Sequence, residues 1–275
     1  MQLRVSLLAV PLLLAGVSLS HAQECTPRVA DGDLIKPGTL VMSTNPTLPP
    51  LQFIDSSGEL KGMRVELGTE IARRLCLEPE YIRIEFSAMV PGLQSGRWDM
   101  INTGIFYTPE RAAIMQMIPY ENQAISISTS TRSGVRIEKL DDLAGLSVGV
   151  EIGGFEENQA KAIDAELREK GLDGMTIRTF DNFALAYQAL RAGQVDAMVS
   201  IDGVAEEYAR RGDFDRAIGG LRPTPVALAF QSRALAEAVG EVLEEMRADG
   251  SFQALFDEYG VSALDGEIEV HGPSN

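Results

Sequence analysis

The chain has 275 residues, with 24 Lys and Arg against 40 Asp and Glu, and a formal net charge of −16 at pH 7. This acidic balance disfavours nucleic acid and anionic membrane surfaces as partners, because phosphates are neutralised by clustered Lys and Arg. The length allows one or two domains with hydrophobic cores of their own.

The first 22 residues are typical of a secretory signal peptide. Arg4 supplies a positive start, residues 7–17 are apolar but too short to span a bilayer, and Ser20-His21-Ala22 has the small residues of a cleavage site. We predict cleavage after Ala22 and an exported protein, since no later stretch is long and apolar enough for a transmembrane helix.

The mature chain keeps two cysteines, Cys25 and Cys76. In an oxidising compartment an even count favours one disulfide, which would tie the N-terminal segment to the end of a helix. Two free buried thiols are the alternative.

Histidine is nearly absent from the mature chain. His21 leaves with the signal peptide, and His271 lies in a polar tail. A Ser-His-Asp triad, a Cys-His pair and a His-based metal site are therefore disfavoured. We predict no metal and no cofactor.

In the first half of the chain, short apolar runs alternate with helical patterns. Leu67, Ile71 and Leu75 recur on one face of a helix that opens at Gly62. The strands expected here are residues 39–43, 81–86, 100–101 and 125–130, with helices at 62–75 and 90–94 and from Thr108.

The second half continues the alternation. The strands expected are residues 147–150, 176–180, 195–199 and 225–230, and the helices are 140–146, 156–170, 182–191, 235–248 and 251–259. Beyond Leu264 the chain is acidic and then polar, which predicts a frayed tail.

One pattern occurs twice, as Leu93-Gln-Ser-Gly-Arg-Trp-Asp99 and as Leu190-Arg-Ala-Gly-Gln-Val-Asp196. Each copy is typical of a helix end, a glycine stop, a turn and a strand. The repeat indicates two similar α/β lobes, and a cleft between two lobes is a common place for a small molecule. Chance similarity between two turns is the alternative.

Alternating strands and helices predict mostly parallel sheets flanked by helices. The last helices need a core, so we expect the chain to return to its first lobe. We place lobe 1 at residues 23–126 and 225–264, lobe 2 at 127–224 and a flexible tail at 265–275. Crossover strands near residues 124–131 and 221–230 would form a hinge.

The segment Thr108-Pro109-Glu110-Arg111 is the sharpest local signal. Thr is a good N-cap and Pro suits the first helical position, which puts Arg111 in the first turn. A cation there opposes the helix dipole, so it suggests another task, and Arg suits two-point recognition of a carboxylate. The alternative is a solvated surface Arg.

Other candidate ligand contacts lie where strands end. Gly153-Gly154 precedes a helix whose free amides could bind an anion, and Thr103-Gly104 offers a hydroxyl and an amide. Phe86 could stack on a ligand or fill the core. Asp202 could accept an ammonium group or serve as a cap or turn residue after a strand.

Together these segments resemble the polar amino-acid-binding branch of the periplasmic solute-binding proteins of ABC importers, from about Gly38 to Val261. The resemblance rests on the order of Pro49-Pro50, residues 62–67, 93–99, 108–111, Pro119-Tyr120, residues 140–145, 148–150, 190–196 and Gly250. It implies a monomeric periplasmic protein whose two lobes close on a small carboxylate, such as an amino acid. An inner-membrane ABC permease would be its partner, and it would not be an enzyme.

The carboxylate half of the implied site matches well. Arg111 corresponds to the Arg that grips the ligand's α-carboxylate. Gly154 and Phe155 fall where a Ser or Thr and helix amides meet the same group, although Phe155 replaces Thr.

The other half of the implied site matches less well. Thr103 and Gly104 correspond to neighbours of the amino-acid head group, and Phe86 corresponds to a stacking aromatic. Asp202 lies one position beyond the expected ammonium-binding Asp, where this chain has Ile201.

Four further positions depart from the pattern. Leu48 stands where an aromatic is common, Phe106 replaces a small hydroxyl residue, and Arg64 stands where Asp is usual. Asn45 replaces an Asp found in binders of basic amino acids, which argues against a cationic ligand side chain.

Three functions fit these observations. The first is a binding protein for an importer. The second is a sensor or accessory protein on the same fold, serving a receptor or a redox enzyme, and it is motivated by the altered ammonium half of the site. The third, a dehydratase-type enzyme, has the least support because histidine is nearly absent.

Overall fold

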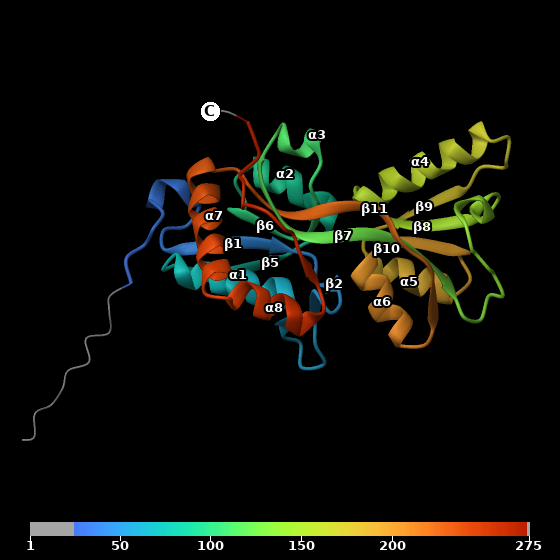
Figure 1. Cartoon of the computed structure of the whole chain (residues 1–275), viewed down its shortest axis with the longest axis horizontal. Helices are drawn as coiled ribbons and strands as arrows, with labels where there is room; N and C mark the ends of the chain where they lie inside the picture. The colour runs from blue at the N-terminus through green and yellow to red at the C-terminus, as the bar shows by residue number, and fades with distance from the viewer. Residues whose placement is uncertain (1–24, 274–275) are drawn as a thin grey trace, which may run out of the picture.

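The computed structural model describes residues 25–273, so the predicted signal peptide and its cleavage site lie outside the described residues. Two long antiparallel strands, β7 (Gln116–Ser130) and β11 (Phe214–Phe230), run through the middle of the molecule and connect two α/β lobes (Figure 1). The sheet order is β5-β1-β6-β11-β7-β10-β8-β9, so the first three strands lie on one side of this pair and the last three on the other. The predicted two-lobe α/β architecture is confirmed.

Lobe 1 holds the N-terminal strands and the C-terminal helices. Its parallel strands are β1 (Thr39–Thr44), β5 (Glu78–Arg83) and β6 (Met100–Phe106). Its helices are α1 (Met63–Arg74), α2 (Met89–Gln94), α3 (Pro109–Ala112), α7 (Arg233–Ala248) and α8 (Ser251–Tyr259). Its remaining short elements are η1 (Asp31–Asp33), η2 (Phe86–Ala88), β2 (Thr47–Leu48), β3 (Gln52–Ile54), β4 (Leu60–Lys61) and β12 (Ser262–Ala263).

Lobe 2 is smaller and repeats the same layering. It contains η3 (Leu140–Leu143), β8 (Ser147–Glu151), α4 (Phe155–Glu169), β9 (Thr176–Phe180), α5 (Phe183–Arg191), β10 (Ala197–Ile201) and α6 (Asp202–Arg210). Helix α4 lies apart from α5 and α6, on the other side of the strands (Figure 1). Asn182 caps α5 by accepting a hydrogen bond from the Leu185 amide, as expected for a helix that begins there.

The repeated sequence pattern marks equivalent places in the two lobes. The glycine of each copy lies in the left-handed region, with φ of 68° and 69°, which an L-residue adopts at a cost. The Asp that ends each copy then binds the neighbouring parallel strand. Asp99 accepts from the Val41 amide at 2.9 Å, and Asp196 accepts from the Ser147 amide at 2.8 Å. The similarity therefore reflects a shared strand junction.

Cys25 and Cys76 form a disulfide with a Cα–Cα distance of 5.5 Å. Cys76 lies two residues after the end of α1, so the bond ties the start of the described chain to the end of that helix. This prediction is confirmed.

The C-terminal segment differs from the frayed tail that the sequence suggested. His271 and Met117 exchange backbone hydrogen bonds of 2.7 and 2.9 Å, and β12 pairs with β7. Ile268 and Val270 lie over Gly240 of α7 and pack against the main core. Ile268 and Val270 are two residues apart, so in an extended segment both side chains lie on the same face. This apolar face packs on lobe 1 and holds residues 265–273 against it.

Within residues 25–273, no helix combines the length and the apolar character needed to cross a bilayer.

Candidate functional site

The two lobes touch where the ends of their strands face each other. The Asn45 amide of lobe 1 donates to Glu151 of lobe 2 at 2.7 Å. The rings of Phe106 and Phe155 stack across the same boundary, with centroids 4.5 Å apart. We call this region the interlobe site, and define it by Asn45, Leu48, Arg64, Phe86, Thr103, Gly104, Phe106, Arg111, Glu151, Gly154, Phe155, Glu156 and Ile201.

Arg111 is held at the edge of this site by the local sequence. Thr108 caps the short helix α3 by accepting from the Arg111 amide at 3.2 Å, and Pro109 takes the first helical position, as predicted. The guanidinium donates to the Phe106 carbonyl at 2.8 Å and to the Gly153 carbonyl of lobe 2 at 3.4 Å. Arg111 therefore bridges the lobes and is not a solvated surface residue.

Arg111 also lies over an aromatic ring and beside a hollow. Its guanidinium is 5.4 Å from the centroid of the Phe86 ring, a cation–π contact. Phe86 itself is buried in an apolar cluster, so it fills the core and supports Arg111 at once. Arg111 and Phe155 line a cavity of about 690 Å³ that opens between the lobes.

Thr103 and Gly104 lie deep in the site. The Thr103 hydroxyl accepts from the Gln52 amide at 2.7 Å. A Cβ on Gly104 would lie 2.5 Å from the Ile201 side chain and 2.9 Å from an Arg64 nitrogen, so a larger residue would have to displace the ends of these two side chains. Ile201 of lobe 2 therefore covers Gly104, with Leu48 also in contact.

Arg64, a departure in the sequence pattern, is fully buried. It makes a two-point ion pair with Glu121 of β7, at 2.8 and 3.0 Å, and donates to Gln52 at 3.1 Å. The sequence analysis did not single out Glu121 or Gln52. A signal was present for Glu121, since it is an acid that directly follows the apolar residues 117–120 and lies just before the predicted crossover strand.

Asp202 is not free to receive a ligand ammonium group in this arrangement. It accepts from Ser126 and pairs with Arg216 at 2.5 Å, and the Gly220 amide donates to it at 3.2 Å. It lines a separate cavity of about 530 Å³, away from Arg111. In this arrangement Asp202 is paired with Arg216, and Ile201 lies beside Gly104, so the structure does not bring Asp202 together with the other predicted ligand contacts.

Sequence analysis also missed two acidic residues of lobe 2, Glu151 and Glu156. Both are 2 % exposed. Burial, together with repulsion from Glu156 and Glu85, raises the pKa of Glu151 well above its usual range. Burial raises the pKa of Glu156 to about 7, against the opposing charges of Arg111 and Arg64.

Replacing Glu156 with Gln is expected to stabilise the protein above neutral pH and to change little near pH 4. The folded chain keeps a proton on Glu156 up to about pH 7, whereas the unfolded chain loses it near 4.5. The free energy of unfolding therefore falls by about 3 kcal/mol between these values, and Gln removes that fall. Urea unfolding at pH 4 and pH 8 measures the difference.

The neighbouring Glu157 supplies a control of opposite sign. Hydrogen bonds from Lys161 and the Gly153 amide lower the pKa of Glu157 despite partial burial. Glu157→Gln should therefore destabilise the protein at pH 8. Parallel pH profiles for the wild type and Glu156→Gln would contradict the assignment.

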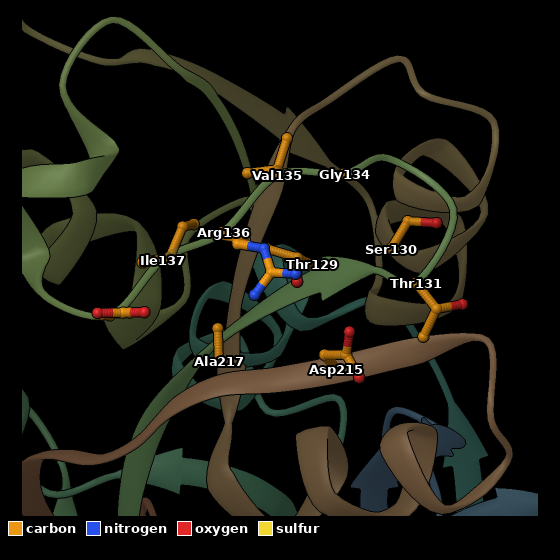
Figure 2. A pocket seen from close by; sticks show the side chains of 10 residues that line it. Thr129, Ser130, Thr131, Gly134, Val135, Arg136, Ile137, Asp215 and Ala217 are labelled. Carbon is orange, nitrogen blue, oxygen red and sulfur yellow. The ribbon is translucent and has the colours of Figure 1, made fainter.

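A third hollow, of about 340 Å³, lies in lobe 2 where β7 ends and β11 begins (Figure 2). Arg136 and Asp215 point into it, between the ends of β7 and β11. None of the predicted ligand contacts lines this hollow. Among residues 25–273, no cluster of His, Cys, Asp and Glu could hold a metal ion.

Comparison with known proteins identifies the family of this chain. The sequence profile of the bacterial extracellular solute-binding proteins, family 3, matches residues 40–262. The chain belongs to this family. Its members' common fold explains why the ends of the strands of both lobes face one another.

Two curated relatives are similar to this chain over most of its length. The L-cystine-binding protein TcyJ of Escherichia coli (strain K12) is 28 % identical over 227 residues, which cover 81 % of this chain and 82 % of TcyJ. A probable amino-acid ABC transporter-binding protein of Haemophilus influenzae is 26 % identical over 245 residues, covering 86 % and 89 %.

Solved structures give the same fold. An ancestral arginine-binding protein bound to arginine superposes with a TM-score of 0.74 at 30 % identity, covering 81 % of this chain and 98 % of its own. The ancestral amino acid-binding protein AncCDT-1, a precursor of cyclohexadienyl dehydratase, gives 0.72 at 27 %, covering 81 % and 95 %. The fold is thus shared by binding proteins and by a precursor of an enzyme. The fold alone therefore cannot distinguish a binding function from catalysis, and the residues of the site have to be considered.

Proposed function

We propose that this protein captures an amino acid or a related small carboxylate in the interlobe site and presents it to an ABC permease of the inner membrane. The protein would act in the periplasm and close its two lobes on the ligand. The observation that carries the proposal is the position of Arg111, which reaches from α3 in lobe 1 to the Gly153 carbonyl beside the start of α4 in lobe 2.

A carboxylate placed beside Arg111 would meet two favourable features. The guanidinium can donate two parallel hydrogen bonds in exchange for its present carbonyl contacts. The N-terminal amides of α4, which begins at Phe155, add a partial positive charge from the second lobe. Because the two features belong to different lobes, the ligand would hold the lobes together.

Two acids in and near the interlobe site are already engaged. Glu151 bonds to a neutral amide, and Asp202 is paired with Arg216. The dehydratase alternative can be tested by incubating the protein with prephenate or arogenate and following absorbance, and we expect no turnover.

One observation favours an accessory or sensory role as the second candidate. Ile201 covers Gly104, and Phe106 stacks on Phe155, so apolar side chains occupy the part of the site where the resemblance expects an ammonium group. A protein that only signals or docks would not need an open ammonium subsite, so it would tolerate apolar side chains there.

A thermal-shift screen separates the two candidates. We expect one class among amino acids, opines and small mono- and dicarboxylates to stabilise the mature protein. A ligand at 100 times its Kd adds about 2.7 kcal/mol, and each kcal/mol is worth roughly 2–4 °C for a protein of this size. A shift of several degrees supports transport. A flat response across the panel would favour the accessory role.

A further inference from the structure

The last residues of the described chain lie as an ordered strap on lobe 1. We call residues 264–273 the C-terminal strap. Arg247 of α7 donates to the Leu264 carbonyl at 2.8 Å, which fixes the start of the strap. Gln116, the first residue of β7, donates to the Pro273 carbonyl at 3.0 Å, which fixes its end. The strap is therefore held at both ends by side chains of lobe 1.

The strap lies outside the part of the chain that the family profile matches, residues 40–262. The family profile therefore implies no role for it, and a role has to come from the contacts that the strap makes.

His271 connects the strap to a wall of the interlobe cavity. Its backbone exchanges hydrogen bonds of 2.7 and 2.9 Å with Met117 of β7. Its imidazole ring lies against the ring of Tyr107, with centroids 5.2 Å apart and ring planes inclined by 55°. This separation is within the range of favourable aromatic pairs. Because the backbone of His271 is fixed on a strand, its ring is held in place beside Tyr107.

Tyr107 belongs to the same cavity as Arg111. Both side chains line the hollow of about 690 Å³, and Tyr107 directly precedes Thr108, the cap of α3. The Tyr107 amide donates to the Pro225 carbonyl of β11 at 2.8 Å, so its backbone is tied to a crossover strand. Its half-buried ring also packs against the apolar cluster that contains Phe86. Tyr107 thus joins the cavity to the C-terminal strap.

We propose that Tyr107 is a ligand contact of the interlobe cavity and that His271 is its positioning residue, which makes the C-terminal strap part of the binding apparatus. A compound whose carboxylate binds Arg111 would lie beside the Tyr107 ring, because both side chains line one cavity. Without the imidazole, the Tyr107 ring would lose its contact with the strap, and the bound compound would have to order it. This inference rests on the proposed function, since it concerns the same site.

The chain provides its own probe for this contact. Once the predicted signal peptide is removed, His271 is the only histidine, so the NMR signals of its ring can be assigned without ambiguity. Tyr107→Leu should shift these signals in the absence of any added compound, because an aromatic ring is removed from beside the imidazole.

Binding should also reach His271 through Tyr107. The mature protein is titrated with acetate, the minimal carboxylate, and with the amino acid or dicarboxylate that gives the largest thermal shift. We expect the His271 signals to move with occupancy in the wild type. In Tyr107→Leu they should stay where they are while the same compound is added.

Two variants of His271 separate support of the ring from other effects. His271→Ala should raise the Kd of the same compounds about three- to tenfold, the range that corresponds to a lost aromatic pair. His271→Phe keeps a ring beside Tyr107, so its Kd should stay within about twofold of the wild-type value. Calorimetric titration gives the three values.

Val270→Ala is the matched structural control. Val270 packs over Gly240 of α7, away from the Tyr107 ring, so its truncation loosens the strap on lobe 1 without removing the aromatic contact. This variant should lower Tm and leave the Kd within about twofold of the wild type.

The outcomes distinguish this inference from the proposed function. Unchanged His271 signals in Tyr107→Leu would overturn the contact itself. A wild-type Kd in His271→Ala, or an equal rise in Val270→Ala, would overturn the positioning role while the proposed function stands. So would His271 signals that do not move when a compound that stabilises the protein is bound. Failure of every amino acid and carboxylate in the thermal-shift screen would overturn both.

Discussion

Arg111→Ala is expected to raise the ligand Kd by roughly 30-fold to several thousand-fold, which corresponds to about 2–5 kcal/mol. The guanidinium lies between a carbonyl of each lobe and above the Phe86 ring, so a ligand carboxylate bound there would be largely removed from water. Alanine would leave that carboxylate without its charged partner. Calorimetric titration with the ligand that gives the largest thermal shift measures the loss.

Two further variants separate charge from geometry. Arg111→Lys keeps the positive charge but loses the two parallel donors, so it should recover only part of the affinity. Arg132→Ala removes an exposed Arg that pairs loosely with Asp213 at 3.4 Å, and it should bind as the wild type does. Affinity within threefold of the wild type in Arg111→Ala would remove Arg111 from the site and with it the main support for the proposed function.

Features that depend on neighbours in sequence were predictable. The start of α3 follows from a Thr cap, a Pro and the residues between them, and the structure places Arg111 where that pattern puts it. The repeated glycine stop followed by Asp marks both strand junctions, because a helix end and the next strand are encoded within a few residues. The fold class could therefore be derived from the order of such local signals.

Strand β11 shows where local patterns were insufficient. The sequence predicts an extended segment from residue 225 and a crossover strand from about residue 221, whereas the strand begins at Phe214. Glycines, prolines and charges interrupt residues 214–224, and the pairing with β7 shifts register several times. The strand forms because β7 provides a continuous partner, which no local pattern reveals. Helix α6, directly after β10, was missed because it carries no strong N-cap side chain.

The electrostatics of the site depend on pairs that are far apart in sequence. Arg64 and Glu121 are 57 residues apart, and Asn45 and Glu151 are 106 apart. Sequence comparison marked Arg64 and Asn45 only as departures, because the compensating carboxylates come from other strands. The pairing of Asp202 with Arg216 could not be foreseen for the same reason, since Arg216 belongs to β11.

The pair of Arg64 and Glu121 links the ligand site to the hinge. Glu121 belongs to the crossover strand β7, and Arg64 lies against Gly104 at the floor of the interlobe site. Gln52 connects the same Arg to Thr103, through hydrogen bonds of 3.1 and 2.7 Å. A change at this pair should therefore affect the stability of lobe 1 and the shape of the site floor together.

Glu121→Ala is accordingly expected to destabilise the protein by about 3–5 kcal/mol, a fall in Tm of roughly 6–20 °C, because it leaves a fully buried guanidinium uncompensated. The double variant Arg64→Met with Glu121→Leu should recover most of this loss, since apolar residues of similar volume need no partner. Glu237→Ala breaks the exposed pair with Arg233, at 2.8 Å, and should cost at most about 1 kcal/mol. Thermal and urea unfolding of the three variants give the comparison. A loss in Glu121→Ala no larger than that in Glu237→Ala would mean that water reaches Arg64, and that the floor of the site is more open than its contacts indicate.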